Sequence, residues 1–215
     1  VVGDFDKKEI VTKIKSKFSI LKGKLKKVTR PKEPKQMKSQ TSVQKTNFKD
    51  CFLNVAFKTQ TTDIKEIAAL DLISYILTYG DTTRLVQSLR LQENIVSDLG
   101  AYQFDGRDPG FFTITLYMKP ENLKKALDIL ADEILTLHGD FIKPEELQKA
   151  IVQIESSEFY QETMDALARR IGNDQFMHND PEFHKKYMKI LKNLKPSEIN
   201  KIIKKYFLVH LNQVG

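Results

Sequence analysis

Four histidines and one cysteine are the side chains of this 215-residue chain best suited to metal binding or nucleophilic chemistry. No two histidines are four residues apart, the spacing that places two imidazoles on one face of a helix. His178, Glu182 and His184 form the closest grouping, but Pro181 interrupts it, so we interpret these residues as the surface of a helix end. Cys51 falls in a predicted buried strand, where a thiol is usually a small apolar filler. The sequence therefore predicts no metal ligands and no catalytic residues in these 215 residues.

Two other kinds of chemical site are also disfavoured by the spacing of residues. Gly106 and Gly110 belong to a predicted hairpin turn and not to the strand-to-helix junction that cradles a phosphate. Acidic residues such as Glu145, Glu146 and Glu155 lie on long predicted helices, where a solvated helix face explains them. The chain offers no sequence signature of a phosphate-binding loop or of a paired-carboxylate site.

The composition describes an ordinary globular protein. Hydrophobic residues make up 40% of the chain and charged residues 29%, which excludes a wholly disordered protein. No run approaches the roughly 18 apolar residues of a membrane-spanning helix, and one cysteine allows no internal disulfide. We interpret residues 1–215 as a single domain. Because Val1-Val2-Gly3-Asp4 resembles the end of a buried strand, we interpret the chain as a fragment of a longer polypeptide.

The net charge of +7 is concentrated in the first quarter of the chain. Residues 7–49 hold 15 Lys and Arg but only two acids, whereas residues 50–215 hold 20 basic and 24 acidic side chains. Residues 22–38 could neutralise phosphates, yet no aromatic residue lies between Phe18 and Phe48 to stack on bases. We therefore interpret residues at about 19–40 as a solvated basic connector, and keep binding of an anionic surface or nucleic acid through 22–38 as an alternative.

Hydrophobic periodicity and turn residues predict an α+β fold with a mostly antiparallel sheet packed against helices. Asp6 and Asp63 are predicted helix N-caps, and Gly80 a helix C-terminus. The helices are predicted at 6–18, 63–79, 82–91, from 120, from 144 to about 176, and as two shorter segments after 181. The strands are predicted at 41–47, 51–58, 95–104, 111–118 and 207–211, with partial burial on both sides of 51–58.

Four stretches, spread over nearly the whole chain, resemble a known family in their order and spacing. They are Val1-Val2-Gly3-Asp4-Phe5-Asp6; residues 68–80 with Thr83-Arg84-Leu85 and Ser88-Leu89-Arg90; residues 144–150, opening a helix that carries Arg169-Arg170-Ile171-Gly172; and Asn179-Asp180-Pro181 leading to residues 199–207. The family is that of the insulinase, pitrilysin and mitochondrial-processing-peptidase zinc metallopeptidases. The chain resembles the non-catalytic C-terminal domain of one half of such an enzyme.

This resemblance implies more than the composition does. Family members close two halves, each of two similar α+β domains, into a chamber around a peptide. A His-x-x-Glu-His motif in the first domain of the active half binds zinc, which activates a water molecule for peptide hydrolysis. That motif does not occur in these 215 residues. The resemblance thus implies no cofactor in this chain, zinc in the parent protein or partner half, and three partners: an upstream zinc-binding domain, a second half in the same chain or as a dimer, and a peptide.

The chain departs from the family at one position that matters for substrate binding. In the substrate-clamping half, an arginine is followed seven residues later by a tyrosine, and both side chains hold the substrate. Arg90 matches the arginine, but Ser97 stands at the position of the tyrosine. Arg90 is therefore a candidate substrate-binding residue with an incomplete clamp, or a helix-end arginine with an ordinary salt bridge.

Two functions follow from the resemblance. The chain is either a non-catalytic domain of an active zinc metalloendopeptidase, shaping the peptide-enclosing chamber, or a domain of a catalytically inactive relative with a structural or assembly role. The upstream sequence would separate these two hypotheses.

Overall fold

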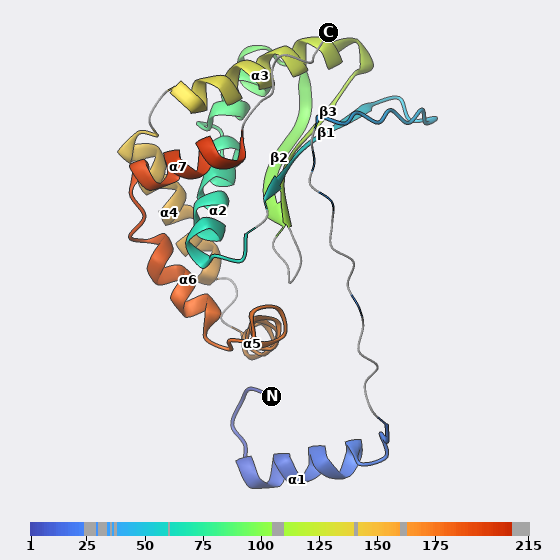
Figure 1. Ribbon diagram of the computed structural model, residues 1–215, viewed down its shortest axis with the longest axis vertical. Helices are drawn as coiled ribbons and strands as arrows, with labels where there is room; N and C mark the ends of the chain where they lie inside the picture. Colours follow the sequence, from blue (N-terminus) through green and yellow to red (C-terminus); the bar gives the residue numbers. More distant parts are fainter. Residues whose placement is uncertain are drawn as a thin grey trace.

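The computed structural model describes residues 1–23, 29, 34, 36, 38–59, 61–104, 110–139, 142–159 and 163–207, the side chain of residue 159 excepted. Its elements combine helices with one small sheet, so the predicted α+β class is confirmed (Figure 1). In chain order they are α1 (Lys7–Phe18), β1 (Cys51–Thr59), α2 (Ile64–Thr78), the π-helix η1 (Val86–Gln92), β2 (Val96–Phe104), β3 (Gly110–Met118), the 3-10 helix η2 (Pro120–Asn122), α3 (Leu123–Gly139), α4 (Pro144–Phe159), α5 (Met164–His178), α6 (Phe183–Leu191) and α7 (Pro196–Tyr206).

The three strands form an antiparallel sheet in the order β1-β3-β2. β3 pairs with β1 along its whole length, from Thr59 opposite Gly110 to Cys51 opposite Met118. On its other side, β3 pairs with β2, and a β-bulge lies between Val96 and Asp98. β3 is therefore the central strand, and its successive side chains point to opposite faces of the sheet, as in any strand.

One face of the sheet carries the core. Phe112, Ile114 and Leu116 are fully buried, which confirms the alternation expected from the sequence of β3. The helices α2 and α7 contact the strands on this side, and the remaining helices of the body gather beyond them (Figure 1). Helix α2 is apolar on most sides because it lies between the sheet and the outer helices, with nine of its residues buried.

The ends of α2 follow the sequence prediction. The Asp63 carboxylate accepts the backbone N–H of Lys65 at 2.7 Å, so it satisfies a donor that the first helical turn cannot. At the other end Gly80 has φ +104°, a conformation that other residues rarely adopt. A glycine directly after the helix therefore ends it at low cost.

Helix α7 and the residue that follows it close the core. Ile199, Ile203 and Phe207 are fully buried, and the Phe207 ring lies 4.8 Å from that of Phe112. His138 Nε2 lies 2.8 Å from the Phe207 carbonyl oxygen, which joins α3 to this end of the chain. The predicted last strand was 207–211. Phe207 belongs to no strand, and residues 208–211 lie outside the described residues.

Two predicted strands are wrong. Residues 41–47 form neither helix nor strand, because Val43 is their one large apolar side chain and it is exposed. Residues 1–4 are not in a strand either, and Val1 is exposed without a partner strand among the described residues. A strand needs a neighbour to bond its backbone, and short apolar runs alone do not supply one.

Three further predictions need correction. The helix expected from 144 to 176 is two helices, because Thr163 takes an extended conformation and caps α5 by accepting the Ala166 N–H. The segment expected as an ordinary short helix is the π-helix η1. Strand β1 is partly buried mainly on one side, since the outward residues Phe52, Asn54 and Ala56 are exposed.

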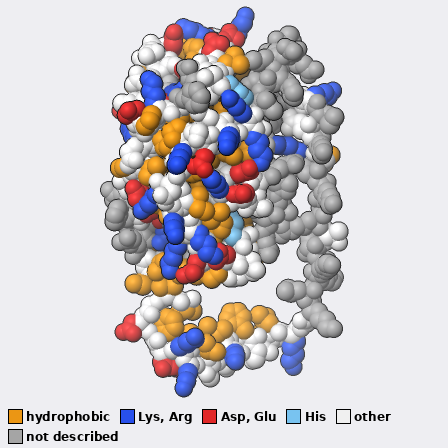
Figure 2. Space-filling model, turned by 60° about the vertical axis from the view of Figure 1, so that its left-hand side comes forward, with side chains coloured by type: hydrophobic (Ala, Val, Ile, Leu, Met, Phe, Trp, Pro, Cys, Tyr) orange, Lys and Arg blue, Asp and Glu red, His pale blue; other side chains and the backbone are white. Residues whose placement is uncertain are grey.

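Helix α1 stands apart from these layers. The Asp6 carboxylate accepts the Glu9 N–H at 2.8 Å and so caps the helix as predicted. None of its residues is buried, and hydrophobic side chains gather along it in the space-filling view (Figure 2). Nowhere in the described part of the chain is a helix long and apolar enough to cross a membrane.

Candidate functional site

The second face of the sheet lies opposite the face that carries the core. The register of the three strands places four outward positions on each of them. They are Phe52, Asn54, Ala56 and Lys58 on β1, Phe111, Thr113, Thr115 and Tyr117 on β3, and Asp98, Gly100, Tyr102 and Phe104 on β2. We call these twelve residues the outer face. Only Lys58 and Asp98 among them carry charge, so the surface is nearly neutral.

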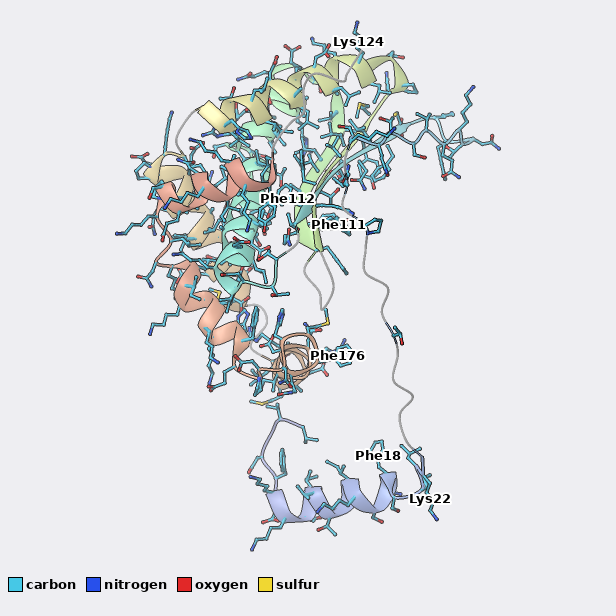
Figure 3. The ribbon with its side chains drawn as sticks, in the orientation of Figure 1. Phe18, Lys22, Phe111, Phe112, Lys124 and Phe176 are labelled. Carbon is cyan, nitrogen blue, oxygen red and sulfur yellow. The ribbon has the colours of Figure 1, made fainter. Side chains whose placement is uncertain are left out.

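Aromatic side chains gather at both ends of the outer face. At one end the rings of Phe52 and Tyr117 lie 4.9 Å apart, and 53% and 43% of these residues are exposed. At the other end Phe111 lies between Phe104 at 5.3 Å and Tyr102 at 6.4 Å. Figure 3 labels Phe111 beside its neighbour Phe112, which belongs to the buried face. Half-exposed rings held by one another form a preorganised apolar surface.

Small and polar side chains separate the two aromatic ends. Thr113 donates its hydroxyl to the Asn54 side chain across the strands, and Thr115 donates to the Gly100 carbonyl at 3.3 Å. Near the Phe111 end, the Lys58 ammonium donates to the carbonyl of Pro34 at 3.1 Å, so the connector passes close to this end of β1. Between its aromatic ends, the outer face therefore satisfies polar side chains by hydrogen bonds across the strands.

The β-bulge of β2 lies at the candidate residue Ser97. In a β-bulge two residues of one strand oppose a single residue of the partner strand. Asp98 is opposite Tyr117, and Ser97 donates its hydroxyl to the Tyr117 carbonyl at 3.1 Å. Ser97 is thus hydrogen-bonded to the backbone of Tyr117, and both residues are exposed.

Arg90 lies near the same end of the sheet. The Ile95 N–H donates to the Leu89 carbonyl at 3.0 Å, so the chain returns from Leu89 directly to the start of β2. From Ile95, two residues of extended chain reach Ser97, a span of at most about 7 Å. Arg90 is exposed and has no hydrogen bond or ion pair to the residues that the structure describes. A π-helical segment is uncommon and is often found at functional sites.

A second arginine fixes the other side of η1. Arg84 donates Nε and Nη2 to the two carboxylate oxygens of Glu146, both at 2.9 Å. Burial raises the pKa of Glu146, but the bonds from Arg84 and the Lys143 N–H outweigh burial and leave the pKa below its ordinary value. This bidentate pair ties the start of η1 to α4 and leaves Arg90 as the arginine of the segment that faces solvent.

With this geometry in place, the comparison with known families is informative. The family described as the peptidase M16 inactive domain matches residues 1–154. The chain belongs to this family. The resemblance to the insulinase-type zinc metallopeptidases is thereby confirmed, and so is the assignment to their non-catalytic domain.

Solved structures support the fold of this M16 inactive domain. A protease from Helicobacter pylori matches with a TM-score of 0.82 and 24% identity over 96% of this chain and 51% of its own. The periplasmic protease PqqL from Escherichia coli matches with a TM-score of 0.74 and 17% identity over 95% of this chain and 23% of its own. The peptidase M16 inactive domain from Pseudomonas fluorescens matches with a TM-score of 0.66 and 18% identity over 73% of this chain and 38% of its own. The chain thus spans about half the length of the Helicobacter protease, and less of the others. A search of curated protein sequences found no match.

The family implies zinc, so the polar clusters of this M16 domain were tested as ligand sets. No group of three or more His, Cys, Asp or Glu side chains suited to a metal ion gathers among the described residues. His184 Nε2 does lie 2.6 Å from a Glu158 oxygen, but Arg170 donates to the same oxygen. A guanidinium already occupies that carboxylate, so the cluster does not fit a cation. It links α4, α5 and α6, and the Asp174 carboxylate, which accepts the His184 N–H at 3.1 Å, joins α5 to α6 a second time.

The remaining sequence candidates lie apart from the outer face. The His178 ring stacks on Phe183 at 3.5 Å, and Cys51 is half-buried in β1. Most of the basic tract 22–38 falls outside the described residues, so its binding of anions stays a prediction. Sequence reasoning missed Tyr117, although its place between Leu116 and Met118 in an alternating strand marks it as an outward residue.

Proposed function

We propose that the chain is the non-catalytic domain of a zinc-dependent metalloendopeptidase, whose outer face forms part of the wall around an enclosed peptide. Membership of the M16 inactive-domain family supports the placement in such an enzyme. The observation that carries the role is the outer face, a nearly neutral sheet surface with aromatic rings exposed at both ends. Such a surface offers apolar contacts to an extended polypeptide of varied sequence.

Within this wall, Arg90 and Tyr117 are the proposed substrate contacts. Arg90 supplies a guanidinium that pairs with none of the described side chains and can donate to peptide carbonyl oxygens or carboxylates. Ser97 cannot supply an aromatic ring, but it holds the backbone of Tyr117, whose half-exposed ring stands on the outer face directly beside it. The tyrosine expected on β2 is, in this proposal, replaced by a tyrosine from the neighbouring strand. We also propose that this chain forms the interface to the zinc-bearing domain of the enzyme.

The test is binding of a labelled, unfolded peptide to the chain and its variants. Tyr117→Ala and Arg90→Ala should each weaken binding at least about fivefold, the effect of losing a principal contact. Tyr79→Ala is the matched control, because Tyr79 is also half-exposed and packed on one ring, that of Tyr75, but lies at the end of α2. Equal losses in all three variants would contradict the proposed wall.

The second hypothesis is that the chain belongs to an inactive relative with an assembly role. The two hypotheses differ in whether the parent protein cleaves peptides. Zinc hydrolysis requires a ligand set that these described residues do not hold. Chelator-sensitive cleavage of an unfolded peptide by the native protein with its paired half would support the active enzyme. Peptide binding by the outer face without any cleavage by the native protein would favour the inactive relative.

A further inference from the structure

Aromatic and small side chains follow a simple order along the central strand of the outer face. The outward residues of β3 are Phe111, Thr113, Thr115 and Tyr117, so two threonines separate a ring at each end of one row. Tyr117 is six positions after Phe111, which at a strand rise of about 3.4 Å per residue corresponds to about 20 Å. The row therefore presents two apolar platforms at a fixed distance from each other.

The neighbouring strands enlarge both platforms and leave the middle low. On β1, the Phe52 ring lies 4.9 Å from that of Tyr117. On β2, the Phe104 ring stacks on that of Phe111 at 5.3 Å. Between these pairs lies Gly100, where an added methyl group would meet only the facing threonine hydroxyl, at 3.6 Å. The two ends thus offer rings for apolar packing, while the middle has room for side chains of several sizes.

The edge strand β2 is poorly suited to pairing with an added strand. Such pairing requires free backbone N–H groups along the edge. The Ala101 N–H instead donates to the Thr78 hydroxyl of α2 at 3.1 Å. The Leu99 N–H donates to the Asp98 carboxylate at 2.9 Å. Because both donors are occupied, a peptide gains more at this strand from side-chain contacts on the outer face than from backbone pairing.

We infer that the outer face selects extended peptide segments that carry two large apolar side chains six residues apart. An extended peptide has nearly the same rise per residue as β3, and its side chains at even offsets point to the same side. An offset of six therefore places one apolar side chain on each platform. Offsets of four and eight miss the second platform by about 7 Å, and offsets of five and seven turn the second side chain away from the sheet.

The charge of the outer face favours this occupant over a nucleic acid. Only Lys58 and Asp98 are charged among its twelve residues, so phosphate groups meet no cluster of cations there. Exposed rings stack on bases, but proteins that bind single strands combine such rings with a positive groove. The inference rests on the proposed function in taking a peptide as the occupant, and it adds the spacing by which that peptide is chosen.

The first experiment measures the spacing directly with the unmodified chain. Labelled peptides rich in Gly and Ser carry two phenylalanines at offsets from three to eight and are titrated against the chain by fluorescence anisotropy. The peptide with an offset of six should bind at least about fivefold more tightly than those with offsets of five or seven, and than a peptide with one phenylalanine.

The other outcomes of this titration are distinct. A preference for offsets of three, four and seven would indicate a helical ligand and overturn the inference. Binding of unfolded peptides with no dependence on the offset would overturn the inference and leave the proposed function standing. No binding of any peptide would overturn both.

The second experiment removes one platform at a time. Tyr117→Ala should abolish the difference between offsets six and five, because only one platform remains, and Phe111→Ala should do the same from the other end. Tyr79→Ala is the matched control, since this half-exposed ring of α2 lies away from the outer face and its loss should preserve the difference. A spacing preference that survives both Tyr117→Ala and Phe111→Ala would overturn the inference.

The third experiment asks whether the peptide backbone takes part. Methylation of two backbone nitrogens between the phenylalanines of the offset-six peptide removes the donors that a paired strand would use. Affinity should change by less than about twofold, because the contacts are made by side chains. A loss of more than about fivefold would show that the peptide pairs with a strand of the sheet, and would overturn the inference.

Discussion

The two faces of one small sheet have opposite roles in this domain. Phe112 and Phe111 are neighbours on β3, yet Phe112 is fully buried against α7 and Phe111 packs on other rings of the outer face. The same strand residues alternate between the two environments because successive side chains point to opposite sides. The buried face gives the fold its stability, and the outer face carries aromatic surface that stability does not require.

This difference predicts which side chains of the sheet can be substituted without unfolding the domain and which cannot. Side chains of the buried face contact many neighbours, so their removal leaves cavities. The aromatic side chains at the two ends of the outer face contact one or two other rings and are partly exposed, so their removal costs less and changes mainly what the surface can bind. The following predictions test that separation in order of expected size.

The largest effect is expected from Phe112→Ala. Removing a fully buried ring at the meeting point of β3 and α7 should lower the free energy of unfolding by about 3–5 kcal/mol. Phe111→Ala, one residue away on the outer face, should cost less than about half of that. Denaturant unfolding of both variants measures the contrast, and equal losses would mean that the outer face is part of the core.

An intermediate effect on stability is expected from the ion pair between Arg84 and Glu146, which joins η1 to α4. Arg84→Met removes both hydrogen bonds to the partly buried Glu146 and should cost about 2 kcal/mol at neutral pH. The lowered pKa of Glu146 means that this contribution is present above its ordinary value of 4.5 and is lost as pH falls through the folded pKa. Unfolding at several pH values should therefore show the two proteins converging in acid. Lys125→Met, which breaks the exposed pair with Glu93, should cost under about 1 kcal/mol.

A smaller effect is expected from the ring pair of the outer face. A double-mutant cycle with Phe52→Ala and Tyr117→Ala should give a coupling of about 0.5–1.5 kcal/mol, the usual value for a tilted aromatic pair. The matching cycle on Tyr75 and Tyr79 of α2 provides a reference on the helix side. No measurable coupling would mean that Tyr117 is not held by Phe52 and that the outer face is not preorganised.

The smallest effect is expected from Ser97→Ala. The Ser97 hydroxyl donates to an exposed backbone carbonyl that water can also satisfy, so the free energy of unfolding should change by under about 0.5 kcal/mol. If the hydrogen bond from Ser97 positions Tyr117, the free energy of peptide binding should fall by more than the free energy of unfolding. A loss above about 1 kcal/mol in the free energy of unfolding would show that the β-bulge itself depends on the hydrogen bond from Ser97 to the Tyr117 carbonyl.

Sequence patterns predicted the buried face better than the outer one. The alternation of Phe112, Ile114 and Leu116 marked the core side of β3, and Asp63 and Gly80 marked both ends of α2. Those signals are local, because caps and period-2 burial act within a few residues. The pattern at 41–47 failed because β propensity without apolar side chains gives a strand nothing to pack against.

The candidate site was less predictable because it joins residues from separate strands. Arg90 and Ser97 came from a resemblance along the sequence, whereas Tyr117 becomes relevant only through the register of β2 with β3 and the bulge at Ser97. A bulge of one residue leaves no clear mark in composition. The exposure of α1 was likewise invisible, since Ile14 and Phe18 have the same four-residue spacing as Ile203 and Phe207, which are buried.

The position of β3 at the centre of the sheet has a consequence for how the chain folds. β2 and β3 are separated by five residues, but fifty residues lie between β1 and β3. Closing the longer loop costs more entropy, so the β2–β3 hairpin can form early while β1 must wait for α2 to dock. We therefore expect substitutions in β1 to accelerate unfolding, and substitutions in β3 to slow folding as well. Until β1 arrives, the hydrogen-bonding edge of β3 is open to other chains, which makes dilute conditions the better ones for refolding this domain.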